Sequence, residues 1–128
     1  MAIYKYDTHV HTKEVSPCGK VPAIEVVKLY KDAGYHGIVI TDHYFASFFI
    51  NLDNLTWDEK IDCYLKGYNK AFEIGKKIGL KVILGMELRF IENANDYLVY
   101  GFDEKFLRNN KELYNLNLKE FRELTKDQ

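Results

Sequence analysis

The stretch Asp7-Thr8-His9-Val10-His11-Thr12 closes the first predicted strand, which covers residues 3–11. Successive side chains on a strand point to opposite faces, so His9 and His11 share one face, and Asp7 lies on it too. Two neutral imidazoles on one face can together hold one divalent ion. The pair also fits cross-strand packing or a surface position, and its spacing alone leaves these interpretations open.

Two further strands end in side chains of the same chemical kind. Residues 37–41 form a short β-branched run typical of a strand buried on both faces, and Asp42 and His43 follow it. The strand predicted over residues 80–87 ends in Glu87. Open α/β sheets and barrels gather their chemistry at strand ends, so three of the four histidines lie where a metal site is expected.

The rest of the pattern predicts alternating helices and strands. The expected elements are a helix over 22–33, a loop over 44–55, a helix over 57–78 opened by a capping box of Thr56 and Glu59, a strand over 97–101, and a final helix over 117–126. This alternation favours a parallel sheet with right-handed crossovers. Residues 89–97 are too few for a crossover helix, so they form either a hairpin or a loop between parallel neighbours.

Length and composition exclude several classes of protein. The chain has 128 residues, enough for one domain and about half of a typical barrel of roughly 250 residues. Hydrophobic residues make up 47% and aromatic residues 15%, which excludes a disordered chain. The net charge is −1, so nothing indicates bulk attraction to nucleic acid or to an anionic membrane. Small charged substrates remain open.

Cysteine content and the N-terminus bear on the compartment. Cys18 and Cys63 are too few and too far apart for a disulfide framework or a zinc ribbon, which favours a reducing compartment. The N-terminal residues lack the apolar stretch of a signal peptide, and no apolar run reaches about eighteen residues. We therefore expect a cytoplasmic protein without membrane segments.

Three motifs occur in a fixed order along the chain. They are Asp7-Thr-His-Val-His-Thr12, Ile40-Thr-Asp-His43 and Gly85-Met-Glu-Leu-Arg89. Together they resemble the polymerase and histidinol phosphatase (PHP) superfamily, and the resemblance covers residues 3 to about 102. It implies an α/β fold, the N-terminal portion of a distorted barrel of seven βα units. It also implies two or three divalent ions (zinc, manganese or iron) at the strand ends and hydrolysis of phosphoester bonds.

The resemblance also implies specific metal ligands. His9 and His11 would hold the first ion, Glu87 would bridge two ions, and His43 would belong to a third position. A bridging carboxylate neutralises two cations at once, and imidazoles suit zinc, iron or manganese.

The chain departs from the family pattern at two positions. Cys18 stands in Ser16-Pro-Cys-Gly19, where many members have an aspartate ligand; it is either a thiolate ligand that favours zinc or a half-buried turn residue. Asp96 stands where a histidine is common. It either holds the second ion beside Glu87 or is a solvated residue at the start of a strand.

Further residues are candidates for contact with substrate or for support of the ligands. Arg89 either clamps a phosphate with its planar fork or pairs only with Glu87 or Glu92. Lys13 and Tyr44 lie in loops after the first two strands, where substrate contacts are expected.

Asp42 and Asp7 are candidates for a supporting role beside the predicted ligands. Asp42 points away from His43 if the strand persists, so we expect it to accept the second ring proton of a metal-bound histidine and to act with Arg89 in catalysis. Asp7 can do the same for His9 and His11 because it shares their face.

The later ligands of the family are absent, namely a histidine on a later strand and an Asp-x-His pair. We therefore expect residues 1–128 to form a single PHP-like domain that is the N-terminal half to two-thirds of a full domain, as a truncated or shortened relative. A sheet that stops there has an unpaired edge, which favours self-association.

We expect a hydrolase that cleaves a small phosphorylated substrate with a metal-bound hydroxide. The sequence contains no nucleophile elbow and no Gly-rich phosphate loop, which agrees with a mechanism without a protein nucleophile. Two alternatives remain: a metal-binding PHP module with a structural or regulatory role and no turnover, and an interaction domain without metal.

Overall fold

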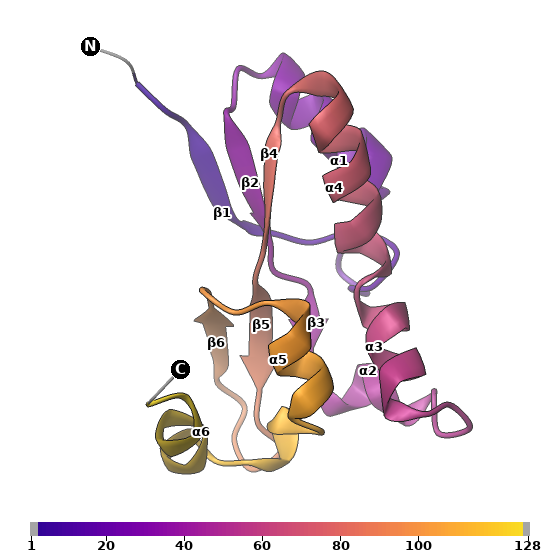
Figure 1. Ribbon diagram of the computed structural model, residues 1–128, viewed down its shortest axis with the longest axis vertical. Coiled ribbons are helices and arrows are strands. Elements are labelled where there is room, and N and C mark those ends of the chain that lie inside the picture. Colours follow the sequence, from indigo (N-terminus) through magenta and orange to yellow (C-terminus); the bar gives the residue numbers. More distant parts are fainter. Residues whose placement is uncertain (1–2, 127–128) are drawn as a thin grey trace.

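The computed structural model describes residues 3–126 of the chain as two three-stranded sheets that lie end to end along the long axis and are flanked by helices (Figure 1). The elements in order are β1 (Tyr6–Val10), α1 (Ala23–Asp32), β2 (Gly37–Ile40), β3 (His43–Tyr44), α2 (Ala46–Ile50), α3 (Trp57–Tyr64), α4 (Lys66–Ile78), β4 (Lys81–Leu84), β5 (Met86–Arg89), β6 (Asp96–Val99), α5 (Glu104–Asn109), a 3-10 turn (Leu113–Asn115) and α6 (Leu118–Thr125).

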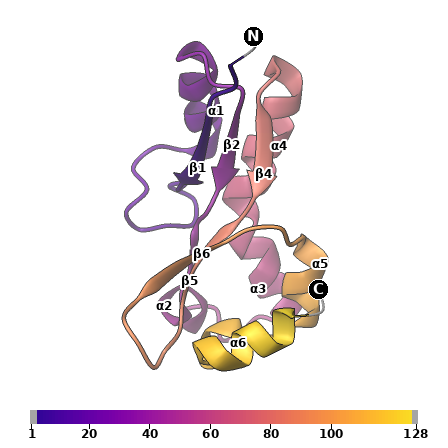
Figure 2. The same cartoon turned by 90° about the vertical axis from the view of Figure 1, so that its left-hand side faces the viewer.

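The first sheet is parallel, with strand order β1-β2-β4. The helices α1 and α4 pack on one side of it (Figures 1 and 2). Its core consists of small and aliphatic side chains, namely Val10, Ala23, Val26, Val27, Ile38, Ile40, Ala71, Leu80 and Val82. We call β1, β2 and β4 with α1 and α4 the aliphatic half.

The second sheet has strand order β3-β5-β6, with β3 and β5 parallel and β5 and β6 antiparallel. Its helices are α2, α3, α5 and α6. The buried core here is rich in aromatic rings, which are Tyr44, Phe49, Trp57, Tyr64, Phe90, Tyr114 and Phe121. We call this second sheet and its helices the aromatic half.

Two strand paths run from the aliphatic half into the aromatic half. β2 is followed by β3 and β4 by β5, so the chain crosses the boundary twice in the same direction. Gly85 lies at the second crossing, where an added Cβ would come within 2.9 Å of Val39 Cγ1 and 3.2 Å of the Val99 carbonyl oxygen. The predicted strand over 80–87 is therefore split at a residue that has no room for a side chain.

The α/β class with mainly parallel strands is confirmed, and several boundaries differ from the prediction. The helix expected over 57–78 is two helices that break at Leu65, which is fully buried. The loop expected over 44–55 contains Tyr44 of β3 and the whole of α2. Residues 89–97 form the hairpin alternative, which joins β5 to β6. The helix α5 was not predicted.

None of the helices in the described part of the chain combines the length and apolar character needed to span a membrane.

Candidate metal centre

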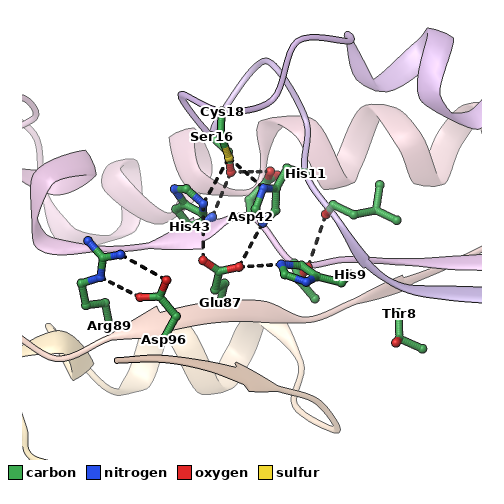
Figure 3. Close-up of polar contacts among 12 residues, drawn as sticks. Thr8, His9, His11, Ser16, Cys18, Asp42, His43, Glu87, Arg89 and Asp96 are labelled. Carbon is green, nitrogen blue, oxygen red and sulfur yellow. Dashed lines mark hydrogen bonds and ion pairs between the residues drawn. The ribbon is translucent and has the colours of Figure 1, made fainter. Parts of the chain in front are cut away.

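The boundary between the two halves brings the predicted ligands together (Figure 3). His9 lies in β1 and His11 directly after it, whereas His43 lies in β3 and Glu87 in β5. The register pairs His43 with Glu87 on adjacent parallel strands. Each half of the molecule thus contributes ligands to one cluster.

Glu87 lies at the centre of the three imidazoles. Its Oε1 is 2.6 Å from His9 Nε2 and 3.3 Å from His11 Nε2, and its Oε2 is 3.4 Å from His43 Nε2. Only 8% of the Glu87 side chain is exposed, so the carboxylate faces the cluster and not bulk solvent. Because its two oxygens face different imidazoles, Glu87 has the geometry that a bridging carboxylate requires.

Cys18 completes a second group of donors. It lies in the loop between β1 and α1, with its Sγ 3.0 Å from His11 Nδ1 and 3.3 Å from His43 Nε2. The thiol is exposed and forms no disulfide. The contacts of Cys18 with two imidazoles agree with the ligand interpretation, which stays a prediction.

Two overlapping groups result, His9 with His11 and Glu87, and His11 with Cys18 and His43; in each, the donor atoms lie within 4.8 Å of one another. Zinc bonds of 2.0–2.3 Å in a tetrahedral site place donors about 3.5 Å apart. The separations of 3.0–3.4 Å about His11, Cys18 and His43 are near this spacing, whereas the 2.6 Å between His9 Nε2 and Glu87 Oε1 is a hydrogen-bond distance. Imidazole, carboxylate and thiol donors are of the types that hold divalent metal ions, and each group offers three of them.

The electrostatics favour the form of His43 that binds metal. Burial lowers the pKa of His43 from its usual value, and the neighbouring His11 lowers it further, against the opposing effect of Glu87. A lowered pKa keeps the imidazole neutral at neutral pH, with a free lone pair. The ring also stacks on Phe45 with 4.3 Å between centroids, which fixes its plane.

An open groove of about 510 Å³ leads to the cluster from the side of α1. Its lining includes His9, His11 and Cys18, residues of the loop between β1 and α1, and apolar side chains of α1. These three donors are therefore accessible from outside.

The prediction that Asp42 accepts a ring proton from a metal-bound histidine is wrong. Its carboxylate instead accepts bonds from the Thr12 N–H at 2.6 Å, the Thr12 hydroxyl at 2.7 Å and the Ser16 hydroxyl at 2.8 Å. Burial raises the pKa of Asp42, and these hydrogen bonds oppose the rise. The carboxylate faces the loop behind the cluster because successive strand residues point to opposite faces.

Asp7 also binds elsewhere than predicted. Its carboxylate accepts bonds from the backbone N–H of His9 and from the hydroxyl of Tyr30. Asp7 thus bonds to the backbone of His9 and not to its ring.

Arg89 and Asp96 pair with each other across β5 and β6. The Arg89 Nε lies 2.6 Å from Asp96 Oδ1, and Nη2 lies 3.1 Å from Oδ2. The bond to Arg89 lowers the pKa of Asp96. The guanidinium also lies 4.2 Å from the centroid of Phe45. Among the described residues, Arg89 forms no ion pair with Glu87 or Glu92, and the Asp96 carboxylate is occupied by Arg89 and not by the histidines.

Tyr44 and Lys13 are the remaining residues predicted to contact substrate. Tyr44 belongs to β3, is 0% exposed and packs against Tyr64, so the prediction that it contacts substrate is wrong. A large ring following His43 on the same strand points into the core. Lys13 lies exposed in the loop after β1, and its role stays a prediction.

Sequence reasoning missed the residues that support the ligands from behind. Thr12 and Ser16 are buried and bind Asp42, and the Tyr64 hydroxyl donates to the Asp42 carbonyl at 2.6 Å. Thr12 and Ser16 lie inside the quoted motifs, which was the available signal. In the sequence, Tyr64 is only one of several apolar positions on a predicted helix, and nothing there indicates its bond to Asp42.

Comparison with known proteins identifies relatives of this chain. The PHP domain family matches residues 7–126. No curated protein matches the sequence. Among solved structures, the chain is similar to a protein of Bifidobacterium adolescentis described as a candidate metal-dependent phosphoesterase, with 24% sequence identity and a TM-score of 0.48. The match covers 76% of this chain and 27% of that one.

Proposed function

The chain belongs to the PHP domain family, and from this premise we propose that it acts in the metal-dependent hydrolysis of phosphoester bonds. The observation that carries the proposal is the convergence of His9, His11, His43 and Cys18 on or beside Glu87 at the boundary of the two halves. The chain spans 27% of the length of the solved relative, so we propose this activity for the complete catalytic unit to which the chain contributes.

The residues of the cluster have distinct proposed roles. Bound divalent ions would supply an activated water and polarise the phosphoryl oxygens. His9 and His11 would hold one ion through their Nε2 atoms, which face Glu87 Oε1. His43 and Cys18 would hold another, with Glu87 Oε2 on the same side. Glu87 would thereby neutralise part of the charge of both ions.

Arg89 is the proposed phosphate contact. Its guanidinium is held in place by Asp96 and by the face of Phe45, while 44% of its side chain remains exposed. The bond to Asp96 uses Nε and one terminal nitrogen, so further N–H groups remain for a substrate oxygen. Lys13 is a second proposed contact for the small phosphorylated substrate.

The donor set supports zinc over manganese. Thiolates are soft ligands that select zinc, whereas manganese prefers oxygen donors. We propose zinc at the position of Cys18, and zinc, manganese or iron at the His9–His11 position. Cobalt substitution tests this: a sulfur-to-cobalt absorption band is expected in the native chain and absent in Cys18→Ser.

Hydrolysis of a chromogenic phosphate ester tests the activity. With zinc or manganese added, we expect turnover that His9→Ala abolishes, together with loss of bound metal by elemental analysis. His36→Ala is the matched control, because His36 lies at the exposed entrance to β2, away from the cluster, where its ring accepts the Lys5 backbone N–H and packs against Tyr4. Turnover that survives His9→Ala unchanged would show that the activity does not belong to this cluster.

A metal-binding module without turnover is the second candidate. The observation that favours it is the pairing of Asp96 with Arg89, which leaves few donors for two or three ions among the described residues. Stoichiometric metal with no hydrolysis in the full-length assembly would favour this module. If the chain binds no metal, only the interpretation as an interaction domain without metal remains.

Two further predictions concern assembly and remain to be tested. The position of residues 1–128 within a larger domain stays a prediction. We also propose self-association, because β1 pairs only with β2 among the described strands and its other edge is open. Sedimentation should show a dimer or larger species, and a stable monomer at working concentration would contradict this.

A further inference from the structure

The carboxylate of Asp42 is buried without a cationic partner. The residue is 2% exposed, and among the described residues no lysine, arginine or histidine forms an ion pair with it. Three hydrogen bonds from two neutral residues, Thr12 and Ser16, satisfy its two oxygens. Burying a carboxylate is costly, so a site that retains one needs these bonds to be complete.

Each bond of the Asp42 side chain ends on a segment that carries a proposed ligand. Thr12 follows His11 directly, and both its N–H and its hydroxyl donate to Asp42. Ser16 precedes Cys18 by two residues; its hydroxyl donates to Asp42 and accepts the backbone N–H of His43 at 2.9 Å.

The backbone of Asp42 reaches the remaining ligand. Its carbonyl oxygen accepts the N–H of Glu87 at 3.1 Å and the hydroxyl of Tyr64 at 2.6 Å. Through these contacts Asp42 connects the loop after β1, the strand β3, the strand β5 and the helix α3. The helix α4 closes the loop from behind, since Gly67 has no room for a Cβ against Thr12.

We propose that Asp42 is the positioning residue of the metal centre, which sets His11, Cys18 and His43 at their mutual distances through Thr12 and Ser16. It makes no contact with the ions in this role. The inference rests on the proposed function, because it requires that the cluster bind metal. It goes beyond that function by assigning the geometry of the site to a residue behind it.

Asp42→Ala and Asp42→Asn form the first test. The alanine removes every side-chain bond, and we expect zinc affinity to fall about 10- to 100-fold, as for other residues that orient metal ligands. The asparagine keeps the shape, accepts at Oδ1 and can donate to the Thr12 hydroxyl, so it should restore affinity to within a few-fold of the native chain. Zinc affinity is measured by competition with a chelating dye.

The visible spectrum of the cobalt-substituted chain separates positioning from stability alone. In Asp42→Ala we expect an altered ligand-field spectrum, and in Asp42→Asn a native one. An alanine variant that unfolds at lower temperature and yet keeps the native spectrum and affinity when folded would overturn the proposal. An asparagine variant as weak as alanine would also overturn it, because the charge would then matter more than the bonds.

Thr12 provides a pair of variants in case Asp42→Ala does not fold. Thr12→Val keeps the shape and removes the hydroxyl that donates to Asp42, whereas Thr12→Ser keeps the hydroxyl. We expect weaker zinc binding in the valine variant only, and equal binding in both would overturn the proposal. If the native chain binds no metal, the proposed function fails together with this inference. If native and variant chains bind equally, the inference alone fails.

Discussion

The aliphatic and aromatic halves both pack helices on a three-stranded sheet, but their cores are built from different kinds of side chain. The aliphatic half packs short side chains between a parallel sheet and two helices, α1 and α4. The aromatic half packs rings from the sheet, from α2 and α3, and from the C-terminal segment against one another. In Figure 2 the C-terminal helices close the aromatic end, whereas no helix among the described residues covers the second face of the sheet at the aliphatic end.

The difference shows why the site lies at the boundary. Each half is internally regular, and the strands change sheets where the two meet. At that crossing Glu87 is paired on both sides, with His43 of β3 and with Leu98 of β6, and its side chain faces the imidazoles that come from β1 and β3. His43 and Glu87 begin the second sheet, while His9 and His11 end the first. The predictions below test the two halves and their boundary, from the largest expected effect to the smallest.

Loss of an aromatic ring should have the largest effect on stability. Phe49 is buried, with its ring 5.5 Å from that of Trp57 and 5.2 Å from that of Tyr114. We expect Phe49→Ala to lower the free energy of unfolding by about 3–5 kcal/mol, because a cavity replaces these contacts. Ile38→Val, which removes one methyl group in the aliphatic half, should cost about 0.5–1.5 kcal/mol.

Urea unfolding of both variants measures these costs. Trp57 is the single tryptophan and lies in the aromatic half, so its fluorescence reports on that half, whereas far-UV circular dichroism reports on both. Coincident transitions are expected if the halves unfold together. A Phe49→Ala cost no greater than that of Ile38→Val would remove the distinction between the two cores.

A glycine at the boundary should be the next most sensitive position. A Cβ on Gly67 would lie 1.9 Å from the Thr12 hydroxyl oxygen. We expect Gly67→Ala to lower stability by about 1–3 kcal/mol, because this overlap outweighs the gain of about 1 kcal/mol in helix propensity. Asn69→Ala, at an exposed position of the same helix, is the control and should change little. Thermal unfolding measures both, and a stabilised Gly67→Ala would contradict the close contact.

Loss of the helix cap at Thr56 should have an intermediate effect on stability. Thr56, the N-cap of α3 in the aromatic half, accepts the Glu59 N–H, whereas the N-cap residues of α1 and α4 form no side-chain bond. At the start of α1 the Glu14 carboxylate accepts the Ala23 N–H instead. Thr56→Ala should therefore cost about 1 kcal/mol in chemical unfolding. Thr56→Ser retains the acceptor and should remain close to the native value. Equal losses in both variants would show that the cap does not stabilise α3.

The Arg89–Asp96 pair should contribute least to stability. Arg89 lowers the pKa of Asp96 in the folded state, so its stabilising effect is present above the usual pKa of Asp96 and is lost as pH falls through the folded value. Because both side chains are more than a third exposed, we expect Arg89→Ala to cost about 0.5 kcal/mol at neutral pH and nothing in strong acid.

Titration of Asp96 followed by NMR tests the Arg89–Asp96 pair directly. The pKa of Asp96 should rise toward its usual value in Arg89→Ala and stay unchanged in Arg122→Ala, a change at an exposed position of α6. An Asp96 titration that does not respond to the loss of Arg89 would show that the pair does not persist in solution.

The aliphatic half was largely predictable because its signals are local. The β-branched run after Gly37 indicated β2, and Gly34 and Gly79 indicated the ends of α1 and α4, where both adopt positive φ. The aromatic half was less predictable. The break at Leu65 and the helix α2 depend on where rings such as Phe49 find partners distant in sequence, and no local pattern carries that information.

The sequence by itself determined the chemistry of the candidate site. Residue types and strand-end positions were enough to indicate His9, His11, His43 and Glu87, because strand alternation and the common edge of parallel strands are consequences of backbone geometry. Only the tertiary structure decided that Asp96 pairs with Arg89, that Tyr44 is buried, and that Asp42 supports the loop from behind. These outcomes depend on distances between separate elements. Packing determines those distances, and no sequence pattern indicates them.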